Sequence, residues 1–138
     1  MVNAVGRSTS LPNQPSSLAE ARRLVDECAR QAGFSDMERA EICLAAHEAV
    51  TNAFRYGSPA GAADSIELQI STEERSLVIA VRDHGGPVAL PAPALPDPEA
   101  FVGHGRGLYL MCHLMDEVQF DWNGGTIVRM TKQHRPDA

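Results

Sequence analysis

Residues 41–57 read EICLAAHEAVTNAFRYG and predict a helix with one polar edge. Glu48, Asn52 and Tyr56 follow at intervals of four, which places a carboxylate, an amide and a phenol along that edge. The apolar neighbours form the buried face, namely Ile42, Ala45, Ala46, Ala49 and Ala53. A carboxylate beside such a face could deprotonate a hydroxyl, and an amide oxygen suits Mg²⁺. Taken alone, the same spacing more often marks a solvated helix edge.

The chain before this segment predicts two helix starts and one strand. A capping box, Ser35 to Glu38, begins the helix just described, and Gly57 ends it. A second capping box, Ser17 to Glu20, begins an earlier amphipathic helix that stops at Gly33. Residues 2–9 are weakly strand-like, and the prolines that follow them predict a loop. The expected order is therefore strand, helix, helix.

The chain after Gly57 predicts two hairpins separated by a long loop and a short helix. Alternating apolar residues at 66–70 and the apolar run 77–81 favour an antiparallel hairpin. Residues 85–103 lack periodicity and are rich in proline, which is typical of functional or disordered loops. A short helix over 108–115 and a hairpin that turns at Asn123-Gly124 complete the chain.

The order of these elements indicates a two-layer α/β sandwich. Strands that pair mostly as hairpins, with helices between the groups, favour helices on one face of a mixed, mostly antiparallel sheet. With 138 residues, of which 43% are hydrophobic, the chain can bury one core, so a single domain over residues 1–138 is expected. A parallel Rossmann sheet would need strict alternation of strand and helix, which this sequence lacks.

Composition argues against several classes of function. The formal charge of −6 and the lack of a Lys/Arg cluster argue against direct nucleic-acid binding. No apolar stretch is long enough for a membrane span or a signal peptide, so a cytoplasmic protein is expected. Cys28, Cys43 and Cys112 are expected to be buried thiols. The histidines show no metal-ligand spacing, so no transition-metal site is expected.

Two glycine-containing segments are further candidates for binding. In VRDHGGP, residues 81–87, Asp83 ends an apolar strand, so its carboxylate could accept a hydrogen bond from an exocyclic amine while the glycines let a flat base approach. In GHGRGL, residues 103–108, glycines precede a helix whose first N–H groups could hold an anion beside Arg106. Each segment alone is weak evidence. The first could be an ordinary Asp-x-Gly turn, and the spacing of the second matches neither a dinucleotide-binding motif nor a P-loop.

Taken together and in this order, the segments resemble the sequence boxes of the GHKL superfamily of ATPases and kinases. Residues 41–57 resemble the N-box, and DHGGP (83–87) resembles the G1 box. GHGRGLYLMCHLMDEV (103–118) resembles the G2 box and the helix that follows it, and GGTIVRMTK (124–132) resembles the closing strands. The EAVTNA and GRGLYLM forms are most similar to those of anti-sigma-factor serine kinases. The resemblance, which runs from about Ser17 to Lys132, implies a Bergerat-type sandwich that holds ATP and Mg²⁺ under a mobile lid, residues 87–104.

The resemblance also implies roles for individual residues. Glu48 would be the general base that activates an acceptor serine, Asn52 would coordinate Mg²⁺, and Asp83 would bind the adenine amino group. Arg106 would lie near the terminal phosphates. The other implied nucleotide contacts are Tyr56, Gly85, Gly103, Gly105, Gly107, Leu108 and Thr126. Phosphoryl transfer asks mainly for positioning and charge stabilisation, which this set could supply without a covalent intermediate.

The function implied by the resemblance is that of a partner-switching regulator, with a homodimer as the default expectation. It would bind and inhibit a sigma factor and phosphorylate a serine of a STAS-type anti-sigma-factor antagonist. Tyr56 stands where many relatives have His, and Pro87 stands where a second G1 glycine is usual. These departures favour the alternative of a nucleotide-binding interaction module without kinase activity. A histidine kinase catalytic domain is disfavoured because no helical hairpin with a phosphorylatable His is present.

Residues outside these segments are expected to be structural. Phe120 and Trp122, near the last hairpin, are expected to pack in the core or at its edge, with a partner surface as the other interpretation. Lys132 and Arg135 are expected to be solvated charges. His47 lies about 100° around the helix from Glu48 and is expected to be packed or exposed rather than catalytic.

Overall fold

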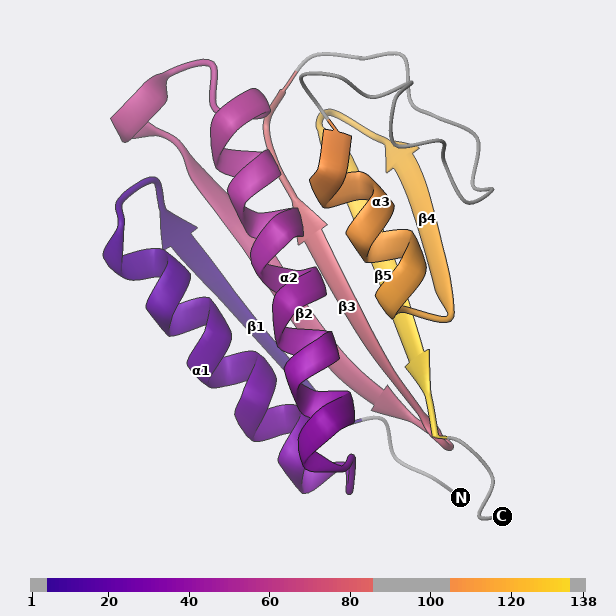
Figure 1. Cartoon of the computed structure of the whole chain (residues 1–138). Coiled ribbons are helices and arrows are strands. Elements are labelled where there is room, and N and C mark those ends of the chain that lie inside the picture. The colour runs from indigo at the N-terminus through magenta and orange to yellow at the C-terminus, as the bar shows by residue number, and fades with distance from the viewer. Residues whose placement is uncertain (1–4, 86–104, 135–138) are drawn as a thin grey trace.

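The chain is described by a computed structural model over residues 5–85 and 105–134. Three helices and five strands follow one another in the predicted order (Figure 1). Their bounds are β1 Val5–Pro12, α1 Ser16–Gln31, α2 Asp36–Tyr56, β2 Ser65–Glu73, β3 Ser76–Arg82, α3 Gly105–Leu114, β4 Glu117–Trp122 and β5 Thr126–Gln133. A 3₁₀ turn, η1 Gly61–Ala63, lies between α2 and β2. The expected lid, residues 87–104, lies outside the described residues.

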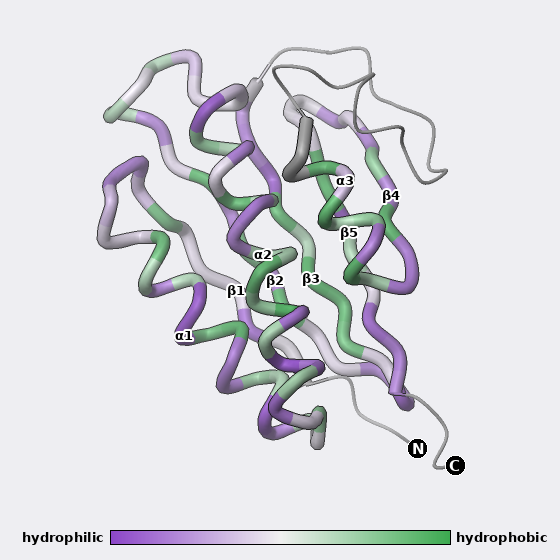
Figure 2. Tube along the Cα trace, in the orientation of Figure 1, coloured by the Kyte–Doolittle hydropathy of each residue, from purple (hydrophilic) through white to green (hydrophobic). Residues whose placement is uncertain are grey.

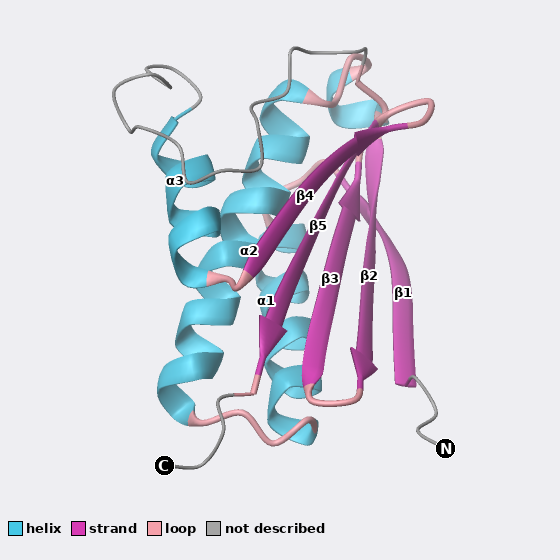
Figure 3. Cartoon of the chain, turned by 90° about the vertical axis from the view of Figure 1, so that its right-hand side faces the viewer, coloured by secondary structure: helices cyan, strands magenta, loops and turns pink. Residues whose placement is uncertain are grey.

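The described elements form two layers. All three helices lie on one face of the sheet, and no described helix covers the other face (Figure 3). In the helical layer α2 is central, with α1 on one flank and α3 on the other (Figure 1). The two-layer α/β sandwich predicted from the sequence is therefore confirmed. Its central helix carries Glu48 and Asn52, and both residues are half-buried.

Every described strand pairing is antiparallel, in the order β1-β2-β3-β5-β4. The described strands therefore lack the parallel pair that a mixed sheet would contain. Two helices join β1 to β2, so the chain returns to the sheet in the opposite direction. Because β5 lies between β3 and β4 and pairs antiparallel with both, β3 and β4 run parallel to each other without pairing.

Of the two predicted capping boxes, the one at Ser35 is present and the one at Ser17 is not. The Ser35 hydroxyl accepts the N–H of Glu38 at 3.2 Å, and the Glu38 carboxylate accepts the N–H of Ser35 at 3.0 Å. Gly33 follows α1 with a left-handed φ of 87°, as expected for a residue that stops a helix. The capping box predicted at Ser17 is wrong, because its hydroxyl donates to the Pro12 carbonyl at 2.6 Å.

The hydrophobic core fills the space between the layers. The predicted apolar face of α2 is buried, and β3 contributes Leu77, Ile79 and Val81 at alternate positions. Figure 2 shows the hydrophobic stretch of β3 at the centre of the sheet. Each large apolar side chain that is fully buried adds about 1.5–3 kcal/mol to the stability of the fold. This core holds α2 and the ends of β3 and β5 in fixed positions.

Candidate nucleotide-binding site

The polar edge of α2 lies on the flank that is turned away from α1. Cys43 lines the groove between α1 and α2, and Asn52, nine residues further on, is rotated by about half a turn from it. Glu48 and Asn52 are half-buried, whereas Tyr56 is 43% exposed. No hydrogen bond or ion pair with a described residue engages the side chain of Glu48 or Asn52. The carboxylate and the amide are therefore available to a ligand beside α3.

Asp83 directly follows β3 and is buried, with 7% of its surface exposed. Its Oδ1 atom accepts two main-chain N–H groups, from Gly85 at 2.9 Å and from Thr126 at 2.9 Å. The N–H of Asp83 donates in turn to the Thr126 carbonyl at 3.0 Å. Within residues 5–85 and 105–134, no donor reaches the other carboxylate oxygen, Oδ2. A buried acceptor of this kind suits a ligand with an N–H group.

Two glycines that the sequence does not single out as site residues enclose Asp83. A methyl group on Gly57, at the end of α2, would collide with the Asp83 carboxylate, and one on Gly125 would collide with the Asp83 carbonyl. A Cβ on Gly85 would lie only 3.0 Å from the Cα of Gly57. The ends of α2 and β3 and the start of β5 therefore meet with no room for larger residues. Their positions next to predicted site residues are the only signal that the sequence carries.

The glycines of the third segment lie in the first turn of α3. This helix begins at Gly105, three residues before the predicted start at Leu108, so Gly105, Arg106 and Gly107 belong to it. The first N–H groups of a helix lack intrahelical partners and can hold an anion. The Leu108 side chain is buried in the core, so only its main chain could contact a nucleotide. Gly103 lies outside the described residues.

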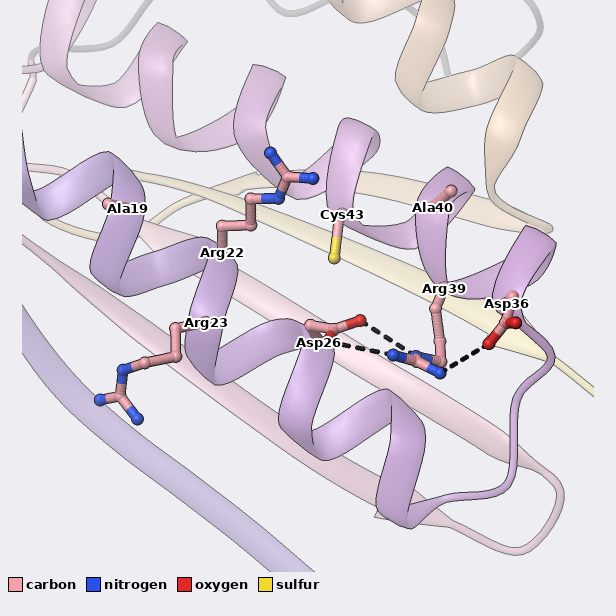
Figure 4. Close-up of a pocket in the computed structure, with 8 residues that line it drawn as sticks. All are labelled: Ala19, Arg22, Arg23, Asp26, Asp36, Arg39, Ala40 and Cys43. Carbon is pink, nitrogen blue, oxygen red and sulfur yellow. Dashed lines mark hydrogen bonds and ion pairs between the residues drawn. The ribbon is translucent and has the colours of Figure 1, made fainter.

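A pocket of about 500 Å³ lies on the other flank of α2, between α1 and α2 (Figure 4). The Arg39 guanidinium crosses it and bonds both carboxylate oxygens of Asp26, at 3.0 and 3.2 Å, and Asp36 at 2.9 Å. The hydrogen bond from Arg39 is the main cause that lowers the pKa of Asp26. The other lining residues are Ala19, Arg22, Arg23, Ala40 and Cys43. None of the residues that the motifs single out lines this pocket, so the candidate site remains at Asp83 and α2.

Lys132 is not a solvated charge, so that prediction is wrong. Its side chain is 3% exposed, and its Nζ donates to the Leu114 carbonyl at the end of α3, at 2.6 Å. The same atom lies 3.5 Å from Oε1 of Glu41 on α2. Lys132 is two residues beyond the buried Met130, so it faces the helices with it. Arg135 lies outside the described residues.

Among the described residues, thiols and histidines form no alternative site. Cys28 and Cys43 are buried as predicted and Cys112 is half-buried, and burial raises the pKa of all three thiols. In the described part of the chain, no group of three or more His, Cys, Asp or Glu residues could hold a metal ion. Mg²⁺, which keeps several waters and takes phosphate oxygens, fits the single amide of Asn52 better than a closed protein cage. None of the described helices is long and apolar enough to cross a membrane.

The sequence of this chain matches a known protein family. The model of the histidine kinase-like ATPase domain matches residues 11–132. The serine-protein kinase RsbW of Bacillus pumilus is 30% identical over an alignment of 132 residues that covers 88% of this chain and 82% of that protein.

Solved structures share the same architecture. The RsbU and RsbW domains of Rv1364c from Mycobacterium tuberculosis match with a TM-score of 0.70 at 18% identity, over 96% of this chain and 33% of that one. The present chain therefore spans about a third of that structure. The SiaB–SiaC complex from Pseudomonas aeruginosa matches with a TM-score of 0.66 at 12% identity, over 91% of this chain and 88% of that one. With its family match over most of its length, the chain belongs to the histidine kinase-like ATPase domain family, the GHKL type, and is related to the serine-protein kinases RsbW.

Proposed function

We propose that this chain is an ATP-dependent protein serine kinase that acts as an anti-sigma factor in a partner-switching pathway. It binds and inhibits a sigma factor, and it phosphorylates a serine of a STAS-type anti-sigma-factor antagonist. The observation that carries the proposal is the buried Asp83 carboxylate, whose Oδ2 has no donor among the described residues. It lies against the end of α2, the helix that carries Glu48 and Asn52, whose side chains no described residue engages. The similarity to serine-protein kinases named RsbW supports the choice of a protein acceptor. A homodimer and a cytoplasmic location belong to the same proposal.

Adenine is recognised at Asp83 in this proposal. Oδ2 accepts the exocyclic amino group, while Oδ1 stays bound to the main chain of Gly85 and Thr126. Without side chains, Gly57 and Gly85 pack closely around Asp83 and hold its carboxylate in place. The phosphates extend toward the first turn of α3, where Gly105, Arg106, Gly107 and the main chain of Leu108 contact them. Gly103, which lies outside the described residues, belongs to the same proposed set of contacts.

The two residues proposed to support phosphoryl transfer, Glu48 and Asn52, lie on the polar edge of α2. Glu48 accepts the proton of the acceptor serine hydroxyl as that oxygen bonds to the transferred phosphorus, which gives phosphoserine and leaves ADP. Asn52 holds Mg²⁺ through its side-chain oxygen. When bound, ATP supplies the phosphoryl group, and Mg²⁺ neutralises charge on the phosphates. The half-burial of Glu48 and Asn52 limits competing water at both groups.

The second candidate is a nucleotide-binding interaction module that does not transfer phosphate. The exposed Tyr56, which stands where many relatives have His, favours it. Both candidates share the nucleotide pocket, so only transfer to a protein separates them.

The test begins with Mg²⁺-dependent ATP binding by calorimetry. The wild-type chain is expected to bind, whereas Asp83→Asn, which replaces one carboxylate oxygen by a donor, and Asn52→Ala are expected to lose most of the affinity. Transfer of labelled phosphate is then measured with a STAS-domain protein from the same genome, with its acceptor serine replaced by Ala as a blank. Glu48→Gln is expected to bind ATP but transfer phosphate about 10²–10⁴-fold more slowly.

His47→Ala is the matched control, because His47 neighbours Glu48 on α2 and is exposed. It is expected to bind and transfer as the wild type does. If the wild type binds ATP without any transfer, the second candidate replaces the kinase. If it binds no ATP, both candidates fall.

A further inference from the structure

Trp122 lies in the same cross-strand row as Asp83. It is the last residue of β4 and pairs directly with Thr126 of β5. The Thr126 carbonyl accepts the N–H of Asp83, and the Thr126 N–H donates to the Asp83 carboxylate. Side chains alternate along a strand, so Trp122 faces the same side as Phe120 and Val118, which pack in or against the core under α3. The row Asp83, Thr126, Trp122 therefore crosses three strands on the face that the helices cover.

The Trp122 side chain ends beside the glycine segment that follows β3. Its indole Nε1 donates to the carbonyl of Gly85 at 3.4 Å, yet the residue remains 47% exposed. A large aromatic side chain with half of its surface in water is unusual for core packing. Phe120 and Val118, earlier on β4, already fill the core positions of this strand. Trp122 therefore presents apolar surface to the space next to Gly85 and Asp83.

We propose that the indole of Trp122 forms a wall of the nucleotide pocket and contacts the adenine base, a proposal that rests on the proposed function. Asp83 accepts a hydrogen bond from the polar edge of the base, and Trp122 contacts the apolar surface of the base, which a carboxylate cannot. Contacts between nucleobases and aromatic rings are favourable for any base, because every base has a π-face. Trp122 thus raises affinity for the nucleoside part of ATP, and Asp83 supplies the preference for adenine.

The variant Trp122→Ala separates a base contact from a phosphate contact. It is expected to weaken binding of both ADP and ATP by about tenfold, within the range found for aromatic contacts to bases. Trp122→Phe keeps a ring but loses the indole N–H, and it is expected to bind within a few-fold of the wild type if the ring contact dominates. Calorimetry with Mg·ADP and Mg·ATP measures both, and circular dichroism checks that each variant is folded.

A second measurement needs no variant. Trp122 is the single tryptophan of the chain, so intrinsic fluorescence reports on it alone. ADP is expected to change the emission as the indole becomes covered, with a midpoint equal to the calorimetric Kd. Gln119→Ala, at an exposed position on the other face of β4, is the matched control and is expected to leave binding and emission unchanged.

The outcomes distinguish the two proposals. If the wild type binds ATP but Trp122→Ala binds ADP and ATP equally well, the base contact is overturned while the nucleotide site stands. A loss of affinity for ATP alone, or an emission that ADP leaves unchanged, overturns it as well. If nucleotide binding is intact and only binding of the STAS-domain protein is lost, Trp122 belongs to a partner surface instead. If the wild type binds no nucleotide, the proposed function itself fails.

Discussion

The site depends most on one residue, Asp83, which its neighbours hold from several sides. Gly57 packs against its carboxylate, Gly125 packs against its carbonyl, and Oδ1 accepts the N–H groups of Gly85 and Thr126. Burying a carboxylate costs free energy unless hydrogen bonds compensate. Here the compensating donors are main-chain groups, so they cannot swing away as side chains can. The acceptor for the base is therefore positioned before a ligand arrives, which lowers the entropic cost of binding.

Gly125→Ala tests the close approach at this residue. The added methyl group would collide with the Asp83 carbonyl, so the main chain has to shift. The free energy of unfolding is expected to fall by about 2 kcal/mol. ATP affinity is expected to fall too, because the adjacent Thr126 N–H would move away from Asp83. Urea unfolding and calorimetry measure the two effects.

The control for this substitution is Gly6→Ala. A Cβ at Gly6 would meet its nearest neighbour, the Ile70 carbonyl, at 3.7 Å, which is an ordinary contact. Gly6→Ala is therefore expected to unfold near the wild-type urea concentration. Equal midpoints for Gly125→Ala and Gly6→Ala would show that position 125 does not require glycine.

At the scale of elements, Lys132 joins three of them. It lies on β5, its ammonium group donates a hydrogen bond to the carbonyl of Leu114, the last residue of α3, and it forms an ion pair with Glu41 of α2. Lys132→Met keeps the apolar stem but leaves the Leu114 carbonyl without its donor. The free energy of unfolding is expected to fall by about 2 kcal/mol, less than for a fully buried pair because Glu41 is partly exposed and can be solvated. Urea denaturation followed by circular dichroism measures it.

Arg129→Ala is the control on the same strand. Arg129 is exposed on the opposite face of β5, and no ion pair with a described residue engages it. Its removal is expected to change the stability by less than about 0.5 kcal/mol. If Lys132→Met is no more destabilising than Arg129→Ala, the buried lysine does not hold the three elements together.

The elements themselves could be predicted where their chemistry is local. The capping box at Ser35 needs only Glu38, three residues away, and both hydrogen bonds are present. The same pattern failed at Ser17, because a carbonyl outside the helix, that of Pro12, takes its hydroxyl. The burial of Lys132 was within reach, since the alternation along β5 places it on the core face. The prediction that Lys132 is solvated was wrong because it rested on the charge of the side chain alone.

At the scale of the whole molecule, strand order creates the site. The family resemblance implied that both Asp83 and Thr126 lie near the adenine, and in the structure these two residues are hydrogen-bonded to each other. The contact of Gly125 with Asp83, and the row that extends to Trp122, exist because β5 lies between β3 and β4, and the contact of Gly57 with Asp83 exists because α2 ends beside β3. No local sequence pattern encodes that order. These residues were therefore beyond sequence reasoning alone.

The stability of the whole molecule is expected to fall in acid, in part through Asp26. Its pKa is lowered mainly by the hydrogen bonds from Arg39, which join α1 to α2. The pKa of Glu38 is lowered mainly by its hydrogen bond with the main chain of Ser35. Both folded-state pKa values lie below the ordinary values of these groups, which are 3.8 for Asp and 4.5 for Glu. The stabilisation is therefore complete above about pH 5 and is lost as the pH falls through the lowered pKa values.

Melting temperatures at pH 6 and pH 3 test this dependence. Asp26→Asn is expected to melt below the wild type at pH 6, because the ionic hydrogen bonds to Arg39 are weakened, and to approach it at pH 3, where Asp26 is becoming protonated. The difference is modest because the Asp26 side chain is 42% exposed. Glu74→Gln, in the exposed turn between β2 and β3, is expected to shift with pH as the wild type does. If Asp26→Asn loses as much stability in acid as the wild type, the bond between α1 and α2 contributes nothing to the acid sensitivity of the fold.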